Sequence, residues 1–432
     1  MEDTAIVRAY KNLLRNHPDF AYLWLAQVVS LLGDWFLTIV LSALVARFSG
    51  GSGVAVSAFL LARFLPPLLV APFAGVLIDR FDRKRLLILS DVGRAITVIL
   101  LLFALRPEML WLIYVLTVIQ WSISAVFDPG RNAIIPSLLP RDQLVVGNTL
   151  SSVTWSVMLA VGAIVGGAVA LLLGTEGAIA IDALTYVISA FLIVRIRMHP
   201  EYALGIETNA DNETGKTEKG FIDGLRYAFR YPATLAALLV KTGQSLGNVD
   251  ALMVIYASTL FMMGDDSTTP LSIMYTAFGI GAVLGPLLLN RFNNGSVRIM
   301  RRLIIIGFVW ITLGWFVMGA AATLPLVSLA LVLRAMGGSA NWTYSSIIIQ
   351  KSVADSFLGR MFSLDMTGFQ AASAISIAVT GVLVDTVGTE NVRHVVSLLG
   401  VASLLPLVIW VVVVPRLERR EEPQVTAAAA GD

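Results

Sequence analysis

Twelve long apolar runs, separated by short polar turns, constrain this chain of 432 residues more than any other feature. A helix needs about 20 residues to cross a membrane, and each run has about that length or more. Only 14% of the residues are charged and 57% are hydrophobic, whereas soluble domains carry about 25% charged residues. The sequence therefore predicts an all-α membrane protein with twelve transmembrane helices. The runs are 20–47, 54–78, 86–105, 109–132, 146–173, 178–197, 233–263, 271–290, 302–321, 325–349, 361–387 and 395–414.

Basic residues are distributed unevenly between the two sides that these runs define. With the N-terminus in the cytoplasm, 24 of the 31 Lys and Arg residues fall in cytoplasmic segments, and the external loops hold only Arg47, Arg106 and Arg393. Cytoplasmic loops carry such an excess. The first run is too long for a signal-peptide core and lacks a clear cleavage site. We therefore expect a multi-pass protein of the plasma (cytoplasmic) membrane with both termini in the cytoplasm.

One extended polar segment divides the runs into six and six. Residues 207–220 have the composition of a flexible linker, and 221–230 interleave apolar and charged residues as an interfacial helix does. A weak echo of the first half's basic turn recurs at Gly285, Arg291 and Arg298, which suggests a duplication. The predicted parts are an N-terminal six-helix bundle (1–197), a cytoplasmic linker with an interfacial helix (198–232), a C-terminal six-helix bundle (233–414) and a cytoplasmic tail (415–432).

The turn between the second and third runs holds six charges within residues 79–85. By charge alone it is a basic loop that sets topology. The pattern of Gly75, Asp79-Arg80 and the basic trio that begins at Arg83 closely resembles the loop between helices 2 and 3 of the major facilitator superfamily. That family usually has a second Gly where this chain has Asp82. This variant is similar to the branch that contains macrolide-efflux and siderophore-export proteins.

In that family the loop is a conformational latch that bridges helix ends in one state and releases them in the other. A Gly in the loop would let two backbones approach closely. Further charged pairs in the third run and at the end of the fourth are expected near the same cytoplasmic side. The latch candidates are Gly75, Asp79, Arg80, Arg83, Asp91, Arg94, Asp128 and Arg131.

Charged residues inside the membrane are the next candidates, because burying a charge there is expensive. Asp34 lies roughly 21 Å into the first run at 1.5 Å per residue, on a polar stripe with Gln27 and Thr38. Arg63 lies at a similar depth in the second run. Two interpretations stay open: a structural ion pair, or a carboxylate that binds a proton or a cationic substrate and is held or released by Arg63.

Polar stripes recur on the runs that the resemblance identifies as helices 1, 4, 7 and 10, which line the central cavity in this superfamily. Aromatic rings beside them suit a lipophilic, cationic ligand; hydrogen bonding between helices is the plainer interpretation. The candidates for proton coupling or substrate binding are Asp34, Arg63, Gln27, Trp35, Gln120, Trp121, Lys241, Asn248, Asp250, Arg334, Asn341 and Trp342.

Several functions lack their sequence motifs. The chain has no Cys, and its three His are far apart in sequence, so we expect no metal and no cofactor. No Walker loop and no hydrolase motif occurs, which argues against ATP drive and against a membrane enzyme. The net charge of +2 implies no nucleic-acid partner. Gly162 and Gly166-Gly167 resemble the Gly-Pro-x-x-Gly-Gly motif of antiporters, with Ala163 replacing Pro; close helix packing explains them as well.

Together these observations predict a monomeric secondary transporter of the major facilitator fold. The resemblance implies proton-coupled export of a lipophilic small molecule, such as a drug, a macrolide or a siderophore. A lysophospholipid transporter or flippase of the same fold is the alternative, and a non-transporting membrane sensor is another.

Overall fold

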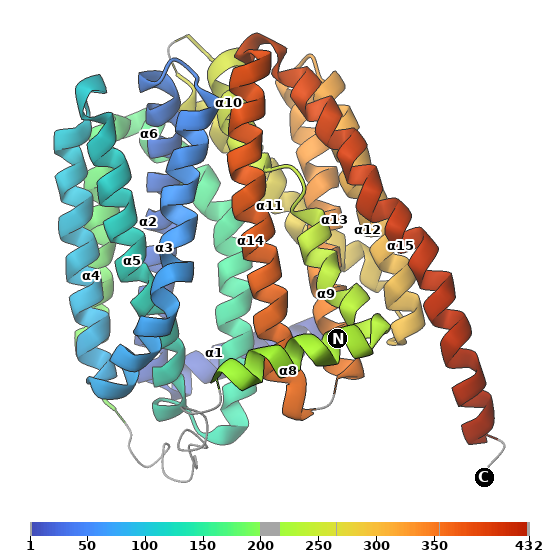
Figure 1. Ribbon diagram of the computed structural model, residues 1–432. Coiled ribbons are helices and arrows are strands. Elements are labelled where there is room, and N and C mark those ends of the chain that lie inside the picture. The colour runs from blue at the N-terminus through green and yellow to red at the C-terminus, as the bar shows by residue number, and fades with distance from the viewer. Residues whose placement is uncertain (1, 199–216, 265, 354, 430–432) are drawn as a thin grey trace. The chain divides into compact units, whose positions relative to one another are not determined.

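The structure is a computed structural model that describes residues 2–198, 217–264, 266–353 and 355–429, which are almost entirely helical (Figure 1). Most of the predicted linker therefore lies outside the described residues. Within them, ten helices are long and apolar enough to cross a membrane, two fewer than the sequence predicts.

Local backbone conformation explains the difference between ten helices and twelve predicted spans. Helix α6 (Leu144–Arg195) runs through two predicted spans, 146–173 and 178–197, and Gly174 at φ 68° separates them. Only glycine adopts such a conformation at little cost. The predicted run 233–263 is instead broken into α9 (Pro232–Gln244), α10 (Val249–Ile255) and a π-helical turn (Tyr256–Leu260), with Gly247 at φ 81° in the break. With α6 counted twice and the broken run once, the described chain contains the twelve predicted spans.

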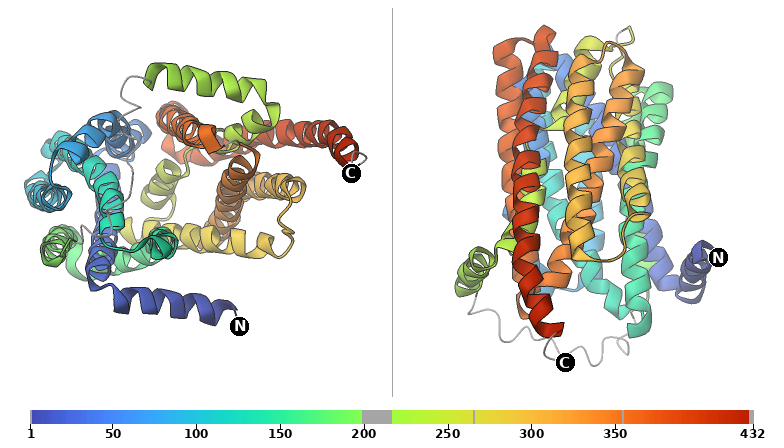
Figure 2. Two further views of the ribbon diagram at one scale, coloured as in Figure 1. Left: turned by 90° about the horizontal axis from the view of Figure 1, so that it is seen from below. Right: turned by 90° about the vertical axis from the view of Figure 1, so that its right-hand side faces the viewer.

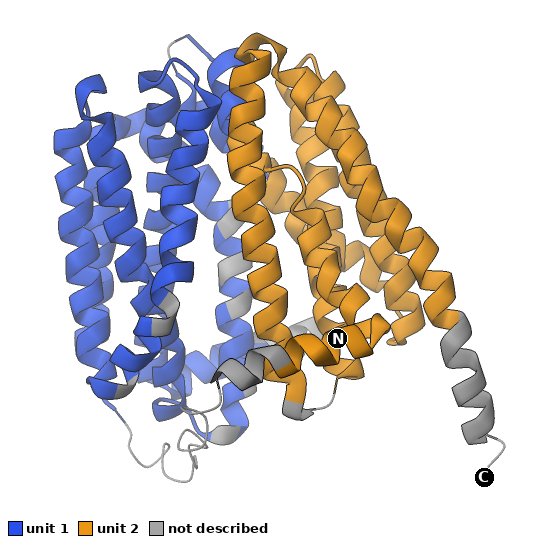
Figure 3. Ribbon diagram, in the orientation of Figure 1, with its two compact units in different colours: residues 1–207, 253–276 blue, residues 208–252, 277–432 orange. Residues whose placement is uncertain are grey.

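The chain forms two compact units (Figure 3). Unit 1 comprises residues 1–207 and 253–276, and unit 2 comprises 208–252 and 277–432. Residues 253–276 thus pack with unit 1, although the sequence places them in the C-terminal bundle. The division into bundles 1–197 and 233–414 remains a prediction.

Unit 1 is built mainly from long helices, and α3 and α4 among them begin at polar caps. The Ser52 hydroxyl accepts a hydrogen bond from the Ala55 N–H (3.2 Å) and starts the third of them. Asp82 accepts one from the Arg85 N–H (2.7 Å), so the residue that replaces the family's second Gly caps the next helix. Besides α6, the helices are α1 (Glu2–Asn16), α2 (Pro18–Phe48), α3 (Gly53–Arg80), α4 (Arg83–Leu100) and α5 (Leu110–Ile134).

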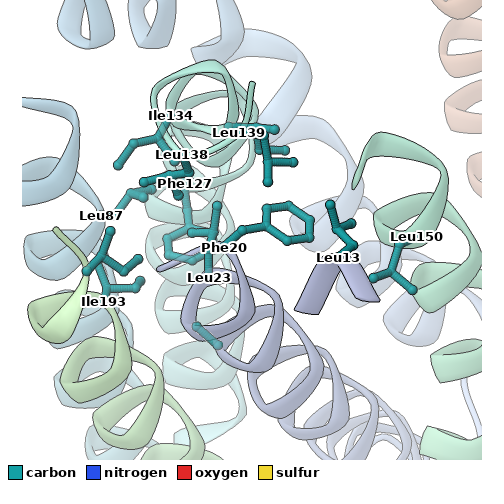
Figure 4. Close-up of a cluster of buried hydrophobic side chains, with 13 residues drawn as sticks. Leu13, Phe20, Leu23, Leu87, Phe127, Ile134, Leu138, Leu139, Leu150 and Ile193 are labelled. Atoms are coloured by element: carbon teal, nitrogen blue, oxygen red, sulfur yellow. The ribbon is translucent and has the colours of Figure 1, made fainter. Parts of the chain in front are cut away.

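A buried apolar cluster holds one end of unit 1 together (Figure 4). Leu13 of α1 and Phe20 of α2 join Phe127 of α5 and Ile193 of α6, all at most 3% exposed. The outer surface is also apolar: Leu172 is 78% exposed. A soluble protein rarely exposes large apolar patches of this kind, so these side chains face lipid.

Unit 2 contains α8 (Thr217–Arg230), α9, the first half of α10 and most of the long helices that follow. Helix α8 covers the predicted interfacial segment; it runs beside the lower part of α14, leads into α9 and packs against both (Figures 1 and 2). The last helix extends to Ala429 and so continues into the predicted tail. The long helices are α11 (Thr268–Asn290), which starts in unit 1, α12 (Val297–Ala320), α13 (Leu324–Ser352), α14 (Asp355–Val387) and α15 (Val392–Ala429).

Asp266 fixes the start of α11. Its carboxylate accepts hydrogen bonds from the N–H groups of Thr268 (2.8 Å) and Thr269 (3.1 Å). Burial tends to raise the pKa of Asp266, but these hydrogen bonds outweigh it and lower that pKa below its usual value. The ionised carboxylate therefore stabilises the first turn of the helix.

Candidate functional site

Asp34 is the centre of a polar cluster in unit 1. The Tyr186 hydroxyl of α6 donates a hydrogen bond to Asp34 Oδ1 (2.5 Å), and the Gln120 Nε2 amide of α5 donates to the same hydroxyl (3.0 Å). Gln120 and Tyr186 are buried. Three helices thus hold one carboxylate oxygen through a chain of hydrogen bonds, and two predicted site residues, Asp34 and Gln120, are brought together.

Asp91 and Arg94 extend this cluster through α4. They form a buried ion pair, and the Ser189 hydroxyl donates a second hydrogen bond to Asp91 (2.7 Å). The Arg94 guanidinium lies over the rings of Phe127 (4.1 Å to the centroid) and Tyr186 (4.4 Å). The sequence places this pair in the cytoplasmic latch. The structure instead connects it through Tyr186 to Asp34.

Asp182 of α6 is a third buried carboxylate that the sequence reasoning missed. It is fully buried, and among the described residues its Oδ2 has no hydrogen-bond partner. Gly33 makes room for it, because a Cβ atom there would collide with the carboxylate. The available clue was one Asp inside the apolar run 178–197. Tyr186, four residues on, carried no such clue.

Arg63 makes no direct ion pair with Asp34. Among the described residues no carboxylate lies within 4.0 Å of its guanidinium. The group lies over Trp121 (4.6 Å) and Trp35 (5.6 Å). Arg63, Asp34, Gln120 and Trp121 nevertheless line one small cavity of about 10 Å³, which is room for about one water. The predicted ion pair is thus replaced by two opposite charges that line one cavity.

Gln27 belongs to a different contact, although it shares the predicted stripe with Asp34. Its amide donates to the Ser151 carbonyl (3.2 Å) and accepts from Arg131 Nη1 (2.8 Å). Thr38 of the same stripe donates to the Asp34 backbone carbonyl (2.6 Å). Residues of the one predicted stripe therefore make separate contacts, and Gln27 does not belong to the cluster around Asp34.

Unit 2 has its own buried charged cluster. Lys241 of α9 and Asp365 of α14 form an ion pair whose side chains are both 0% exposed. The Lys241 ammonium also donates to the Ser346 hydroxyl (2.9 Å) and lies 4.4 Å from the centroid of the Trp342 ring. Asp365 was missed by the sequence reasoning, although it is a carboxylate within the apolar run 361–387.

The break between α9 and α10 gathers the other predicted residues of unit 2. Asn248 Oδ1 accepts a hydrogen bond from the Ala251 N–H (2.8 Å) and so caps α10. Arg334 donates to the Gly247 carbonyl (3.4 Å) and lies over the Trp315 ring (4.6 Å). Asp250 forms no ion pair with Arg334 among the described side chains.

Asn341 is buried against α12. No hydrogen-bond partner is found in the described part of the chain for either polar atom of its amide, and it packs where Gly307 leaves space. No hydrogen bond connects it to Lys241 or Arg334 through the side chains that the structure describes.

The described side chains of the latch candidates do not form one network. Arg83 donates to the Ala133 carbonyl (2.9 Å), Arg80 is exposed, and the exposed Asp128 lies 4.0 Å from Arg131. The side chain of Asp79 lies outside the described residues. The close approach expected at Gly75 is absent: no described atom lies within 4 Å of a Cβ placed there.

The glycines of α6 pack closely. A Cβ on Gly162 would lie 2.7 Å from the Trp35 side chain, and one on Gly166 would lie 3.1 Å from the Phe36 Cα. Small residues thus bring α6 against α2, which accounts for the motif by packing.

Comparisons with known proteins agree on the family and the fold. A family model described as Major Facilitator Superfamily matches residues 23–300 and 248–431. The MFS-type transporter YfiS of Bacillus subtilis (strain 168) is 25% identical, over 88% of this chain and 90% of its own length. Macrolide efflux protein A of Streptococcus pyogenes is 27% identical, over 86% of this chain and 91% of its own length.

Solved structures show the same fold at low identity. A bacterial homolog of the human lysosomal transporter Spinster has a TM-score of 0.69 at 13% identity and covers 92% of this chain and 97% of its own. The nucleoside transporter NupG has a TM-score of 0.65 at 11% identity, covering 90% and 98%.

Proposed function

Because this multi-pass membrane protein belongs to the Major Facilitator Superfamily, we propose that it exports a lipophilic small molecule by alternating access, in exchange for protons. The export direction is supported by its similarity to a protein named for macrolide efflux. We place the protein in the plasma membrane with both termini in the cytoplasm, on the basis of the basic residues in its turns.

The observation that carries the proposal is the cavity of unit 1. Asp34 lines it together with Arg63, Gln120 and Trp121. A carboxylate inside a membrane domain is costly unless it is used or paired, and Asp34 has no cation within 4.0 Å among the described residues. Among the described side chains, the Tyr186 hydroxyl is its hydrogen-bond partner. The carboxylate is thus oriented and is not locked in an ion pair.

This geometry suits the exchange of a proton for a cation. Tyr186 holds one oxygen of Asp34, which leaves the other free to take a proton or to bind an ammonium group. A bound cation and a proton would compete for the same carboxylate. Such competition couples the movement of one to the opposite movement of the other, because each favours a different state of the transporter.

The aromatic rings support a lipophilic substrate. Trp121 lines the cavity, and both Trp121 and Trp35 lie beside Arg63. Apolar surface with a few polar groups is typical of small-molecule sites. The cavity is too small for such a molecule in this conformation, so binding requires the site to open.

Flux measurements test this proposal. Purified protein in proteoliposomes with an imposed pH gradient should move lipophilic amines or macrolides against their own gradient, and a matched panel of siderophores and lysolipids defines selectivity. Binding without flux for every compound would indicate a sensor, and flux that ignores the pH gradient would reject proton exchange.

A further inference from the structure

The buried pair of Lys241 and Asp365 has the composition of a binding site for an organic cation. The Lys241 ammonium contacts a carboxylate, a hydroxyl and the face of an indole ring at once. Carboxylates and aromatic faces are the groups that proteins use to bind ammonium ligands. Ser346 and Trp342 lie four residues apart on α13, so they present one face of the helix. We call Asp365, Trp342 and Ser346 the ammonium cage.

Helix packing alone does not require a charge at this position. In unit 1, Gln27 of α2 contacts the Ser151 carbonyl of α6 with a neutral amide. Lys241 and Asp365 stand 214 residues after Gln27 and Ser151, respectively, and are also in contact. At this matched spacing unit 2 has an ion pair, whereas unit 1 has a neutral amide that bonds a backbone carbonyl and also accepts a hydrogen bond from Arg131.

Stability is also a weak reason for the ion pair. Removing two charges from a polar environment costs several kcal/mol per ion, and replacement of such a pair by apolar residues is often neutral or stabilising. Asp365 can also accept a further hydrogen bond, since its Oδ1 atom has no hydrogen-bond partner among the described residues. Trp342 is 36% exposed, so one wall of the cage reaches the surface of its unit.

We propose that the ammonium cage binds the ammonium group of a cationic ligand, and that Lys241 occupies it as an internal ligand in the conformation seen here. When one ammonium replaces another, the charge on Asp365 stays balanced, which avoids leaving a buried carboxylate unpaired. The inference rests on the proposed function in that a transported cation is the natural ligand. It assigns that cation a second contact, in unit 2, separate from Asp34.

Chemical rescue tests the cage directly. Lys241→Ala removes the part of the side chain that corresponds to n-propylammonium. In the purified full chain, n-propylammonium chloride should raise the melting temperature of this variant saturably by several degrees. Equal concentrations of 1-propanol or sodium chloride should not, and the double variant Lys241→Ala with Asp365→Asn should not respond. An equal response to 1-propanol, or none to n-propylammonium, would overturn the proposal.

The wild-type protein provides the second measurement, which also decides the matter if Lys241→Ala fails to fold. An amine-reactive acylating reagent should modify Lys241 very slowly, because the ammonium is buried. N,N-dimethyloctylammonium, a tertiary amine that forms no stable amide, should speed this modification at least threefold if it displaces Lys241. Lys84 and Lys351 serve as internal references and should react at unchanged rates. An unchanged rate at Lys241 would mark the pair as structural, even if the variant is rescued.

These results are separate from the outcome for the proposed function. If pH-driven export persists while Lys241 stays protected, the cage is wrong and the transporter proposal stands. If the cage binds ammonium but no compound is moved by a pH gradient, proton-coupled export is wrong and the cage stands.

Discussion

The ion pair of Asp91 and Arg94 gives a sharp prediction, because the sequence and the structure assign it to different places. Arg94→Gln should destabilise the protein strongly. It leaves the Asp91 carboxylate buried without a cation, which costs about 3–5 kcal/mol. It also removes cation–π contacts with Phe127 and Tyr186 at 4.1 and 4.4 Å, each worth about 0.5–2 kcal/mol. The Ser189 hydrogen bond to Asp91 remains and offsets a part.

The double variant separates the pair from its surroundings. Asp91→Asn with Arg94→Gln should lose at least about 2 kcal/mol less than the sum of the single losses, because neither charge is then left alone. Reversible unfolding in mixed micelles measures all three variants. A matched control is Asp223 and Arg226 on α8, which have the same spacing but side chains that are 47% and 76% exposed; coupling there should stay below about 1 kcal/mol.

The latch interpretation predicts a different pattern. Stability would change little in Asp91→Asn, single losses would add within about 0.5 kcal/mol, and transport would fall. That combination would refute the assignment of the pair to the buried cluster around Tyr186.

Three further predictions concern stability and topology. Asp266→Asn should lower the free energy of unfolding by about 0.5 kcal/mol at pH 7, because a partly exposed carboxylate at a helix start contributes little. Since the pKa of Asp266 is lowered in the folded protein, this contribution is present above the unfolded value near 3.8 and is lost as the pH falls through the folded value. The difference from wild type should therefore vanish in acid-unfolding curves below that pH. Since the native chain has no Cys, single introduced cysteines report topology. In intact cells, Asn294→Cys should be protected from impermeant thiol reagents and Glu390→Cys should react. The reverse pattern would overturn the orientation. Gly166→Val should cost about 1–3 kcal/mol of stability by overpacking against α2. Gly338→Val should be nearly neutral in the same thermal melt, because no described atom lies within 4 Å of a Cβ at that position. Equal losses would contradict the packing account.

The spans and their order were predictable from sequence because each depends on a local run of apolar residues. The break at Gly247 was not predicted, because a glycine inside an apolar run does not reveal its backbone conformation. The two predicted spans 146–173 and 178–197 are both present in α6, where the non-helical Gly174 separates them.

Partners of buried charges were much harder to predict. Periodicity places Asp34 on one face of a helix, but it does not say which neighbour that face meets. Arg63 at a similar depth was the obvious candidate, and the structure gives Asp34 the Tyr186 hydroxyl instead. Lys241 was found because one cation in an apolar run is conspicuous. Asp365 is just as conspicuous, but its pairing depends on how α14 is rotated against α9, which the sequence does not encode locally.

One measurement tests the central claim most directly: pH-driven transport by Asp34→Asn in proteoliposomes. The variant keeps nearly the same shape and leaves the Tyr186 hydroxyl a hydrogen-bond acceptor, so it should remain folded, as a thermal melt can verify. The account predicts that an imposed pH gradient no longer drives uptake, and that any remaining substrate exchange becomes independent of pH. Normal pH-driven transport by a well-folded Asp34→Asn protein would contradict it.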